Sequence, residues 1–253
     1  MAFIQLNFFS NALGMQTQVD VILPQKNTVG EIGVDNRSQE GSYKCLYLLH
    51  GLSDDQTIWH RRTSIERYSA EYGLCVVMPC AGRSFYMNEK SGNAYYTYIA
   101  KELPARISEF FNVSNKREDR GVAGLSMGGY GALKIGLKEN AVFGMAAGLS
   151  SVADIRSERF AQHLKNLLGE ENYISDDEDL FALAVQKNNE SVKPRVYMAC
   201  GTEDFLYDDN VRLKECFEKL DYDYTYEEGP GVHCWEYWDK QIQNVLKWMF
   251  GSK

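Results

Sequence analysis

The sequence predicts an α/β fold in which a mostly parallel sheet carries helices on both faces. Short, wholly apolar runs such as 45–49 and 74–78 are typical of parallel strands buried on both sides. Stretches with helical periodicity alternate with these runs along the chain. The 253 residues contain no repeat and no linker rich in Pro, Gly or Ser, so we expect a single domain over residues 1–253.

The expected elements follow one another in a regular order. The chain opens on two strands, 4–10 and 17–23, around a turn at 11–14, which gives the sheet an antiparallel start. The polar stretch 25–42 should be a loop. Further strands are expected at 45–49, 74–78, 121–125, 144–149, 195–200 and 222–227. Helices are expected at 58–72, 95–111, 127–138 and 210–220, and a last one with Trp235, Trp238, Ile242, Val245, Leu246 and Met249 on one face.

Two segments depart from this order. Pro104 lies inside the helix expected at 95–111 and should either kink it or begin a new helix. Residues 154–192 form a long connection between strands, with helical pieces at 160–168 and 180–187 and an acidic run at 176–179. This insertion is either a small cap over an active site or a solvated excursion, as runs of charge usually are.

Charge and composition limit the partners. Lys and Arg number 27 against 35 Asp and Glu, a net charge of −8, so neither nucleic acid nor an anionic membrane is an expected partner. No apolar stretch approaches a membrane span and the first cationic side chain is Lys26, so we expect a cytoplasmic protein without a signal peptide. Scattered cysteines without a Cys-x-x-Cys pair predict reduced thiols: Cys45, Cys75, Cys80, Cys200, Cys216 and Cys234.

Residues 124–128, Gly-Leu-Ser-Met-Gly, fit the G-x-S-x-G nucleophile elbow of α/β-hydrolases. A strand is expected to end at Leu125 and a helix to begin at Met127, which places Ser126 on the sharp turn between them. Small flanking residues are required there because the backbone approaches itself closely. A glycine-rich helix cap without chemistry is the alternative, and we predict that Ser126 is a nucleophile.

A serine hydroxyl needs a base to take its proton. His233 stands in a Gly/Pro loop after the last expected strand, where a side chain can project over the carboxyl edge of the sheet. We therefore predict that His233 is the base, with His60 as the alternative. His50 follows a strand in the run His50-Gly51-Leu52-Ser53, which indicates a role in backbone architecture.

The base must in turn be oriented by a carboxylate. Asp204 lies directly in the turn after the strand expected at 195–200, and we predict that it is this acid. Asp208 is its main rival, and Glu203, Asp209 and Asp154 are nearby candidates. The order Ser126, Asp204, His233 is the chain order of the α/β-hydrolase fold.

Acyl transfer also needs N–H donors aimed at the developing oxyanion. One should be the backbone N–H of Met127, and the other that of Leu52, in the loop after the strand 45–49. Aromatic residues near these motifs either pack in the core or line a substrate pocket. Our candidates for the pocket are Trp59, Phe85, Tyr86, Phe205 and Trp235. No metal-binding or nucleotide-binding pattern is present, so no cofactor and no metal is expected.

Four motifs together resemble the esterase D-like putative esterase family, and within it the bacterial tributyrin esterases. They are His50-Gly51-Leu52-Ser53, the run Gly124-Leu125-Ser126-Met127-Gly128-Gly129-Tyr130-Gly131, Gly201-Thr202-Glu203-Asp204-Phe205-Leu206-Tyr207, and Gly231-Val232-His233-Cys234-Trp235. The resemblance covers nearly the whole chain. It implies an α/β-hydrolase fold, metal-independent hydrolysis of short acyl esters, and the same roles for Ser126, Asp204, His233, Leu52 and Met127.

The expected function is therefore that of a serine carboxylesterase acting on a small-molecule ester. The same family includes S-formylglutathione hydrolases and feruloyl and acetylxylan esterases, so a feruloyl or acetyl esterase acting on plant-derived oligosaccharides and an S-formylglutathione hydrolase are the alternatives. Ser53-Asp54-Asp55 stands where the usual formylglutathione hydrolases carry a Thr-Cys pair, which disfavours that alternative. Acyl transfer to an acceptor, an inactive binding protein on a hydrolase scaffold, and a homo-oligomeric state stay open.

Overall fold

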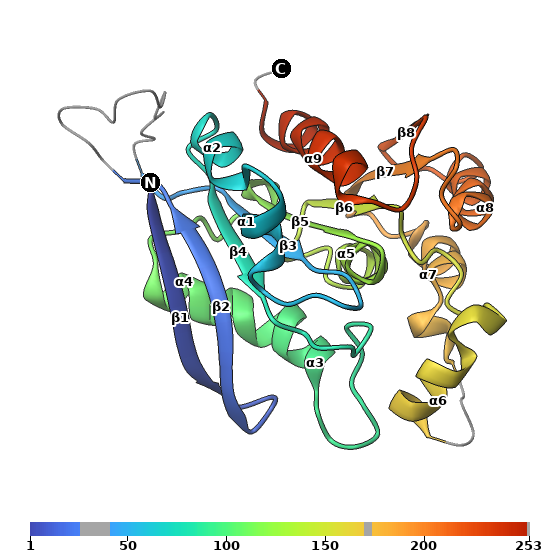
Figure 1. The fold of residues 1–253 in the computed structure, drawn as a ribbon, viewed down its shortest axis with the longest axis horizontal. Helices are drawn as coiled ribbons and strands as arrows, with labels where there is room; N and C mark the ends of the chain where they lie inside the picture. The colour runs from blue at the N-terminus through green and yellow to red at the C-terminus, as the bar shows by residue number, and fades with distance from the viewer. Residues whose placement is uncertain (26–40, 170–173, 252–253) are drawn as a thin grey trace.

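A single eight-stranded sheet in the order β1-β2-β4-β3-β5-β6-β7-β8 forms the centre of the computed structural model (Figure 1). The structure describes residues 1–25, 41–169 and 174–251, so most of the loop expected at 25–42 and residues 170–173 of the insertion lie outside the described residues. The strands are β1 (Ala2–Ser10), β2 (Met15–Leu23), β3 (Cys45–Leu49), β4 (Cys75–Pro79), β5 (Arg120–Leu125), β6 (Met145–Leu149), β7 (Arg195–Gly201) and β8 (Tyr224–Gly229).

Only the first strands of the sheet are antiparallel. β1 pairs with β2 and β2 with β4 in antiparallel register, and every other pair is parallel. The predicted α/β fold with an antiparallel start is therefore confirmed. From β3 the chain first moves to one side, to β4, and then to the other, to β5. The carboxyl ends of β3 and β5 thus form the switch point at which such sheets hold their ligands.

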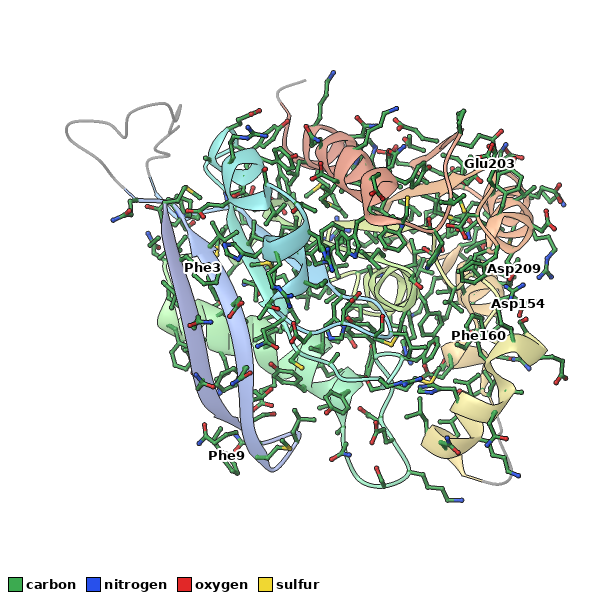
Figure 2. The ribbon with its side chains drawn as sticks, viewed as in Figure 1. Phe3, Phe9, Asp154, Phe160, Glu203 and Asp209 are labelled. Atoms are coloured by element: carbon green, nitrogen blue, oxygen red, sulfur yellow. The ribbon has the colours of Figure 1, made fainter. Side chains whose placement is uncertain are left out.

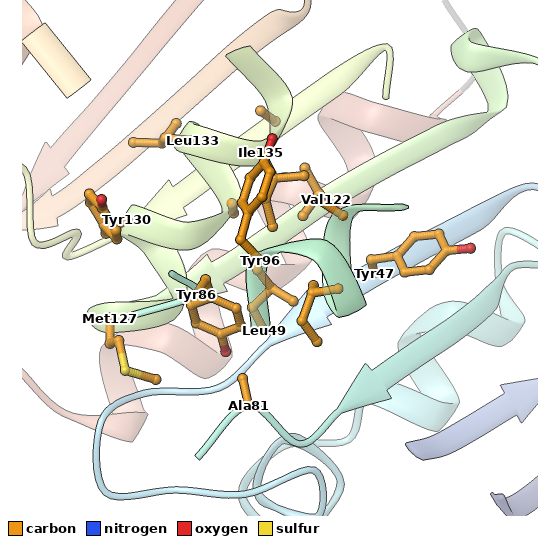
Figure 3. Packing of buried hydrophobic residues seen from close by; sticks show 14 of the residues in the cluster. Tyr47, Leu49, Ala81, Tyr86, Tyr96, Val122, Met127, Tyr130, Leu133 and Ile135 are labelled. Carbon is orange, nitrogen blue, oxygen red and sulfur yellow. The ribbon is translucent and has the colours of Figure 1, made fainter. Parts of the chain in front are cut away.

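Helices cover both faces of the sheet (Figure 1). One face packs against α1 (Ile58–Arg62), α2 (Ile65–Ala70) and α9 (Trp235–Phe250). The other face packs against α4 (Leu103–Phe110), α5 (Met127–Lys138), α7 (Leu180–Lys187) and α8 (Tyr207–Phe217). Figure 3 shows how Leu133 and Ile135 of α5 pack with Val122 of β5 and Leu49 of β3. The helix that follows Ser126 is thus fixed on the sheet by a buried apolar core.

Two of the expected helices are divided. The helix expected at 58–72 breaks at Thr63, whose backbone is extended and whose hydroxyl donates to Trp59 O and accepts from Ile65 N–H. The helix expected at 95–111 consists of α3 (Tyr95–Thr97), a π-helical turn (Tyr98–Glu102) and α4. Pro104 lies in the first turn of α4, where its missing N–H costs nothing. The backbone stays helical at Thr97, Glu102 and Leu103, so the helix continues through the π-helical turn into α4 and does not start anew at Pro104.

The insertion packs on the main body through both apolar and charged groups. It contains α6 (Ala161–Leu168) and α7, with buried Leu164, Leu180 and Leu183. Its acidic run bends back to α5, where fully buried Lys134 donates to the Glu178 carboxylate and to Tyr86 O. The hydroxyl of Tyr130 also donates to Glu178 O. Part of this run is therefore held by the core instead of being solvated.

The six cysteines are free thiols, three of them buried: Cys45, Cys75 and Cys200. Among the helices of the described residues, none has the length and apolar character needed to cross a membrane.

Candidate active site

Ser126 occupies the turn between β5 and α5 in a strained backbone conformation. Its φ is 54° and its ψ is −117°, in a sparsely populated region that costs a residue with a side chain about 1–3 kcal/mol. The turn is packed so closely on β3 that a Cβ on Gly128 would lie 2.5 Å from Leu49 O, and one on Gly124 would clash with Gly128 O. The two glycines of the motif are thus required by backbone contact.

Asp204 and His233 lie in the loops after β7 and β8 and form a hydrogen bond. His233 Nδ1 donates to Asp204 Oδ2 over 2.8 Å, and Leu206 N–H donates to Asp204 Oδ1 over 2.9 Å. Burial acts to raise the pKa of Asp204, but these hydrogen bonds outweigh it and hold the pKa below its ordinary value. An ionised Asp204 keeps the proton on Nδ1, which leaves His233 Nε2 free to accept one.

The loops of this acid and this histidine are joined backbone to backbone. Thr202 N–H donates to Gly229 O over 2.9 Å, and Glu203 N–H donates to Gly231 O over 3.0 Å. The Glu203 carboxylate accepts the Gly231 N–H in return, over 2.6 Å. Asp204 and His233 are therefore held as one unit.

The rival carboxylates and the alternative histidine have other surroundings. Asp154 and Asp209, labelled with Glu203 in Figure 2, pair with Arg212 over 2.7 and 2.8 Å. Asp208 is exposed on the first turn of α8. His60 is also exposed, and its ring stacks on Phe3 of β1.

The loop after β3 is fixed by buried His50. Its ring accepts the Ala81 N–H at Nε2 over 2.9 Å and donates from Nδ1 to Gly51 O over 2.7 Å. Burial lowers the pKa of His50, so the ring is neutral, as this donor–acceptor pattern requires. These contacts place Leu52 beside the turn that begins at Ser126.

A cavity of about 310 Å³ opens between these segments at the switch point of the sheet. It is lined by Gly51, Leu52, Ser53, Asp54, Arg83, Leu125, Ser126, Phe160, Phe205, Leu206, His233, Trp235 and Trp238. Ser126, His233 and Leu52 thus reach one space from three separate loops. Met127 adjoins Ser126 as the first residue of α5, where a backbone N–H has no partner within its own helix.

The structure divides the predicted pocket aromatics into two groups. Phe205 and Trp235 line the cavity, and the Phe205 ring lies 4.6 Å from the His233 ring. Trp59 is buried behind Trp235 and donates its indole N–H to Leu49 O. Phe85 and Tyr86 are fully buried in the core, where Figure 3 shows Tyr86 near Met127.

Several residues at the site were not among the candidates predicted from the sequence. Phe160 comes from the insertion (Figure 2), and nothing in its local sequence indicates a cavity wall. Trp238 lies one helical turn after Trp235, so helical spacing could have identified it. Ser150, at the end of β6, has a φ of 43° and accepts the Trp238 indole N–H over 3.1 Å. Its hydroxyl also helps to lower the pKa of Asp204.

A serine on a strand-to-helix turn, sharing a cavity with a histidine that a carboxylate orients, defines a serine hydrolase on this α/β-hydrolase sheet. Residues 10–249 match the putative esterase family, and the chain belongs to that family. As a member of this family it is a carboxylic ester hydrolase.

Three relatives cover almost the whole chain. An acetyl esterase of Caldicellulosiruptor saccharolyticus is 33% identical over 98% of both chains. The fluorophosphonate-binding serine hydrolase F of Staphylococcus aureus superposes with a TM-score of 0.85 at 35% identity, over 99% of both chains. An S-formylglutathione hydrolase of the same organism gives a TM-score of 0.82 at 34% identity, over 98% of both chains. A ferulic acid esterase at 22% identity shares the fold, with a TM-score of 0.83.

Proposed function

We propose that the protein is a serine carboxylesterase that hydrolyses short-chain acyl esters through an acyl-enzyme on Ser126. The observation that carries the proposal is the cavity into which both Ser126 and the Asp204-bound His233 open. Its volume of about 310 Å³ is at the lower end of the range for ligand sites, which favours a small ester. The acetyl esterase relative supports the same substrate size.

The reaction proceeds in two halves. Ser126 Oγ attacks the ester carbonyl as His233 Nε2 takes its proton, and the N–H groups of Leu52 and Met127 donate to the oxyanion. The tetrahedral adduct collapses, the alcohol leaves with the proton from His233, and the acyl group stays on Ser126. Water then attacks the acyl-enzyme and gives a proton to His233, and His233 passes this proton to Ser126 Oγ as the carboxylic acid leaves.

Hydrolysis of p-nitrophenyl esters from acetate to octanoate tests the proposal. We expect the rate to peak at short chains and to fall at least about 10³-fold in Ser126→Ala, because alanine has no hydroxyl to carry the acyl group. Ser91→Ala, which changes an exposed serine remote from the cavity lining, is the control. A fluorophosphonate probe should label the peptide that contains Ser126 in the wild type, and not in Ser126→Ala.

Methyl ferulate and S-formylglutathione serve as further substrates, because a ferulic acid esterase and an S-formylglutathione hydrolase are among the similar proteins. Faster turnover of either than of short p-nitrophenyl esters would replace the short-chain assignment. Activity that survives in Ser126→Ala would show that Ser126 is not the nucleophile.

A further inference from the structure

Among the described residues that line the cavity, two carry a formal charge at neutral pH: Asp54 and Arg83. Asp54 is half-buried and engaged, since its Oδ2 accepts the Gly51 N–H over 3.2 Å. The Arg83 side chain is exposed and has no hydrogen bond or ion pair to any residue in the described part of the chain. Arg83 is thus a cation at the wall of the cavity whose hydrogen-bond donors are uncommitted.

Neighbouring arginines are different, because each has a carboxylate. Arg156 pairs with Asp176 and Asp179 over 2.9 and 2.6 Å. Arg212 pairs with Asp154 and Asp209, and Arg159 lies 3.6 Å from the Asp209 carboxylate. Arg83 differs from these three arginines because it has no carboxylate beside it among the described residues.

The loop that carries Arg83, residues 80–87, is held in place from three sides. His50 accepts the Ala81 N–H, His163 Nε2 donates to Arg83 O over 2.7 Å, and Lys134 Nζ donates to Tyr86 O over 2.9 Å. Phe85 and Tyr86 have φ values of 51° and 52°, although both are fully buried and neither is glycine. Such strain persists only where the surroundings enforce it, so the backbone that carries Arg83 is fixed in advance of binding.

We propose that Arg83 is a specificity-determining residue that selects esters carrying a carboxylate on their acyl or alcohol part. The proposal rests on the esterase function proposed for Ser126. A guanidinium binds a carboxylate through two parallel charge-assisted hydrogen bonds. Phe160, Phe205 and Trp235 line the same cavity and offer apolar contacts to a bound ester beside this cation. Asp54, the other charge at the cavity, repels the carboxylate and so directs it to Arg83.

Matched substrate pairs test this assignment. Monoethyl glutarate and its primary amide, ethyl glutaramate, differ only in the charge on the acyl part, and 4-acetoxybenzoate and 4-acetoxybenzamide differ in it on the alcohol part. We expect the wild type to prefer the acid of at least one pair. In Arg83→Met, kcat/KM for that acid should fall about tenfold or more, mainly through KM, while the value for the amide changes less than about twofold.

Two further variants serve as controls. Arg83→Lys should retain part of the preference, because the charge remains and the bidentate geometry is lost. Arg106→Met removes the same charge from a partly exposed residue of α4 that pairs with Glu109 and does not line the cavity, and should leave both members of each pair unchanged. The preference should also weaken with added salt.

An equal loss for acid and amide in Arg83→Met, or no preference in the wild type, would overturn the proposal. Calorimetry with Ser126→Ala and with Ser126→Ala/Arg83→Met measures binding of the same four esters without turnover. Binding of an acid that requires Arg83 supports the proposal even if the wild type hydrolyses none of these esters. The esterase function itself is tested separately, by the p-nitrophenyl ester rates of the wild type and Ser126→Ala.

Discussion

Two differently built regions meet at the cavity: the turn at Ser126 and the insertion, of which residues 154–169 and 174–192 are described. The turn contributes Ser126 to the cavity lining, and the insertion contributes Phe160. The turn is held by backbone against backbone, because Gly124 and Gly128 leave no room for a Cβ. The insertion is held by apolar side chains and by ion pairs, of which Lys134–Glu178 is buried and Arg156–Asp176 is exposed.

This difference shows where the site can vary. A backbone contact admits almost no substitution, so the position of Ser126 is tied to the sheet. A side-chain contact can be exchanged at a cost of a few kcal/mol or less, so the wall at Phe160 can change while the turn does not. Specificity is therefore most easily altered from the insertion.

The sharpest test of this comparison makes the same glycine-to-alanine substitution in the turn at Ser126 and in the insertion. Gly128→Ala should abolish folding or activity, because its Cβ would lie 2.5 Å from Leu49 O and 2.6 Å from His50 O. Gly169→Ala, in the insertion, meets only the flexible end of Lys90 and a φ of 87°, so we expect a loss of about 1–2 kcal/mol. Thermal unfolding and esterase rates measure both effects, and equal effects would refute the comparison.

Asp204→Asn tests whether Asp204 orients His233 for catalysis. The amide can no longer fix the proton on His233 Nδ1, so kcat should fall by about 10²–10⁴. Asp209→Asn, a matched change five residues along the chain, removes only pairs with Arg212 and Arg159 and should alter kcat less than about threefold. Similar rates for the two variants would reject Asp204 as the acid.

The same variant should change how the free energy of unfolding depends on pH. Because the folded protein holds the pKa of Asp204 below its ordinary value, the unfolded chain takes up this proton first as the pH falls. The stabilisation is complete well above pH ~4 and is lost as the pH falls through the folded pKa. The difference in unfolding free energy between wild type and Asp204→Asn should therefore shrink in acid.

Effects on stability alone are expected from the ion pairs of the insertion. Glu178→Gln should reduce the free energy of unfolding by about 2 kcal/mol, because it leaves Lys134 buried without a charge partner. Burial lowers the pKa of Lys134 to about 8 against the opposing effect of Glu178, so Lys134 can lose its proton in the variant, which limits the cost. Asp176→Asn, in an exposed pair, should cost less than about 0.5 kcal/mol by denaturant unfolding.

The strands, the helix after Ser126 and the grouping of Ser126, Asp204 and His233 could be foreseen from the sequence. Buried strands have continuous apolar runs, and parallel strands bring their following loops to one edge. The break at Thr63 could not be foreseen, because a side chain that bonds its own backbone leaves no change in hydrophobic periodicity. The residues that line the cavity could not be predicted either. Trp59 and Trp235 are neighbours in space, and only the packing decides which of them faces the cavity.

The joined loops of Asp204 and His233 have one more consequence, because His233 follows β8, which is the edge strand of the sheet and is only half-buried. Edge strands open locally at lower free energy than a core strand such as β5. When this edge opens, the bonds to Gly229 O and Gly231 O break, so His233 leaves while Asp204, which follows β7, and the serine turn stay in place. The lifetime of the assembled site is therefore set by the local opening of one strand, and not by the global stability of the protein.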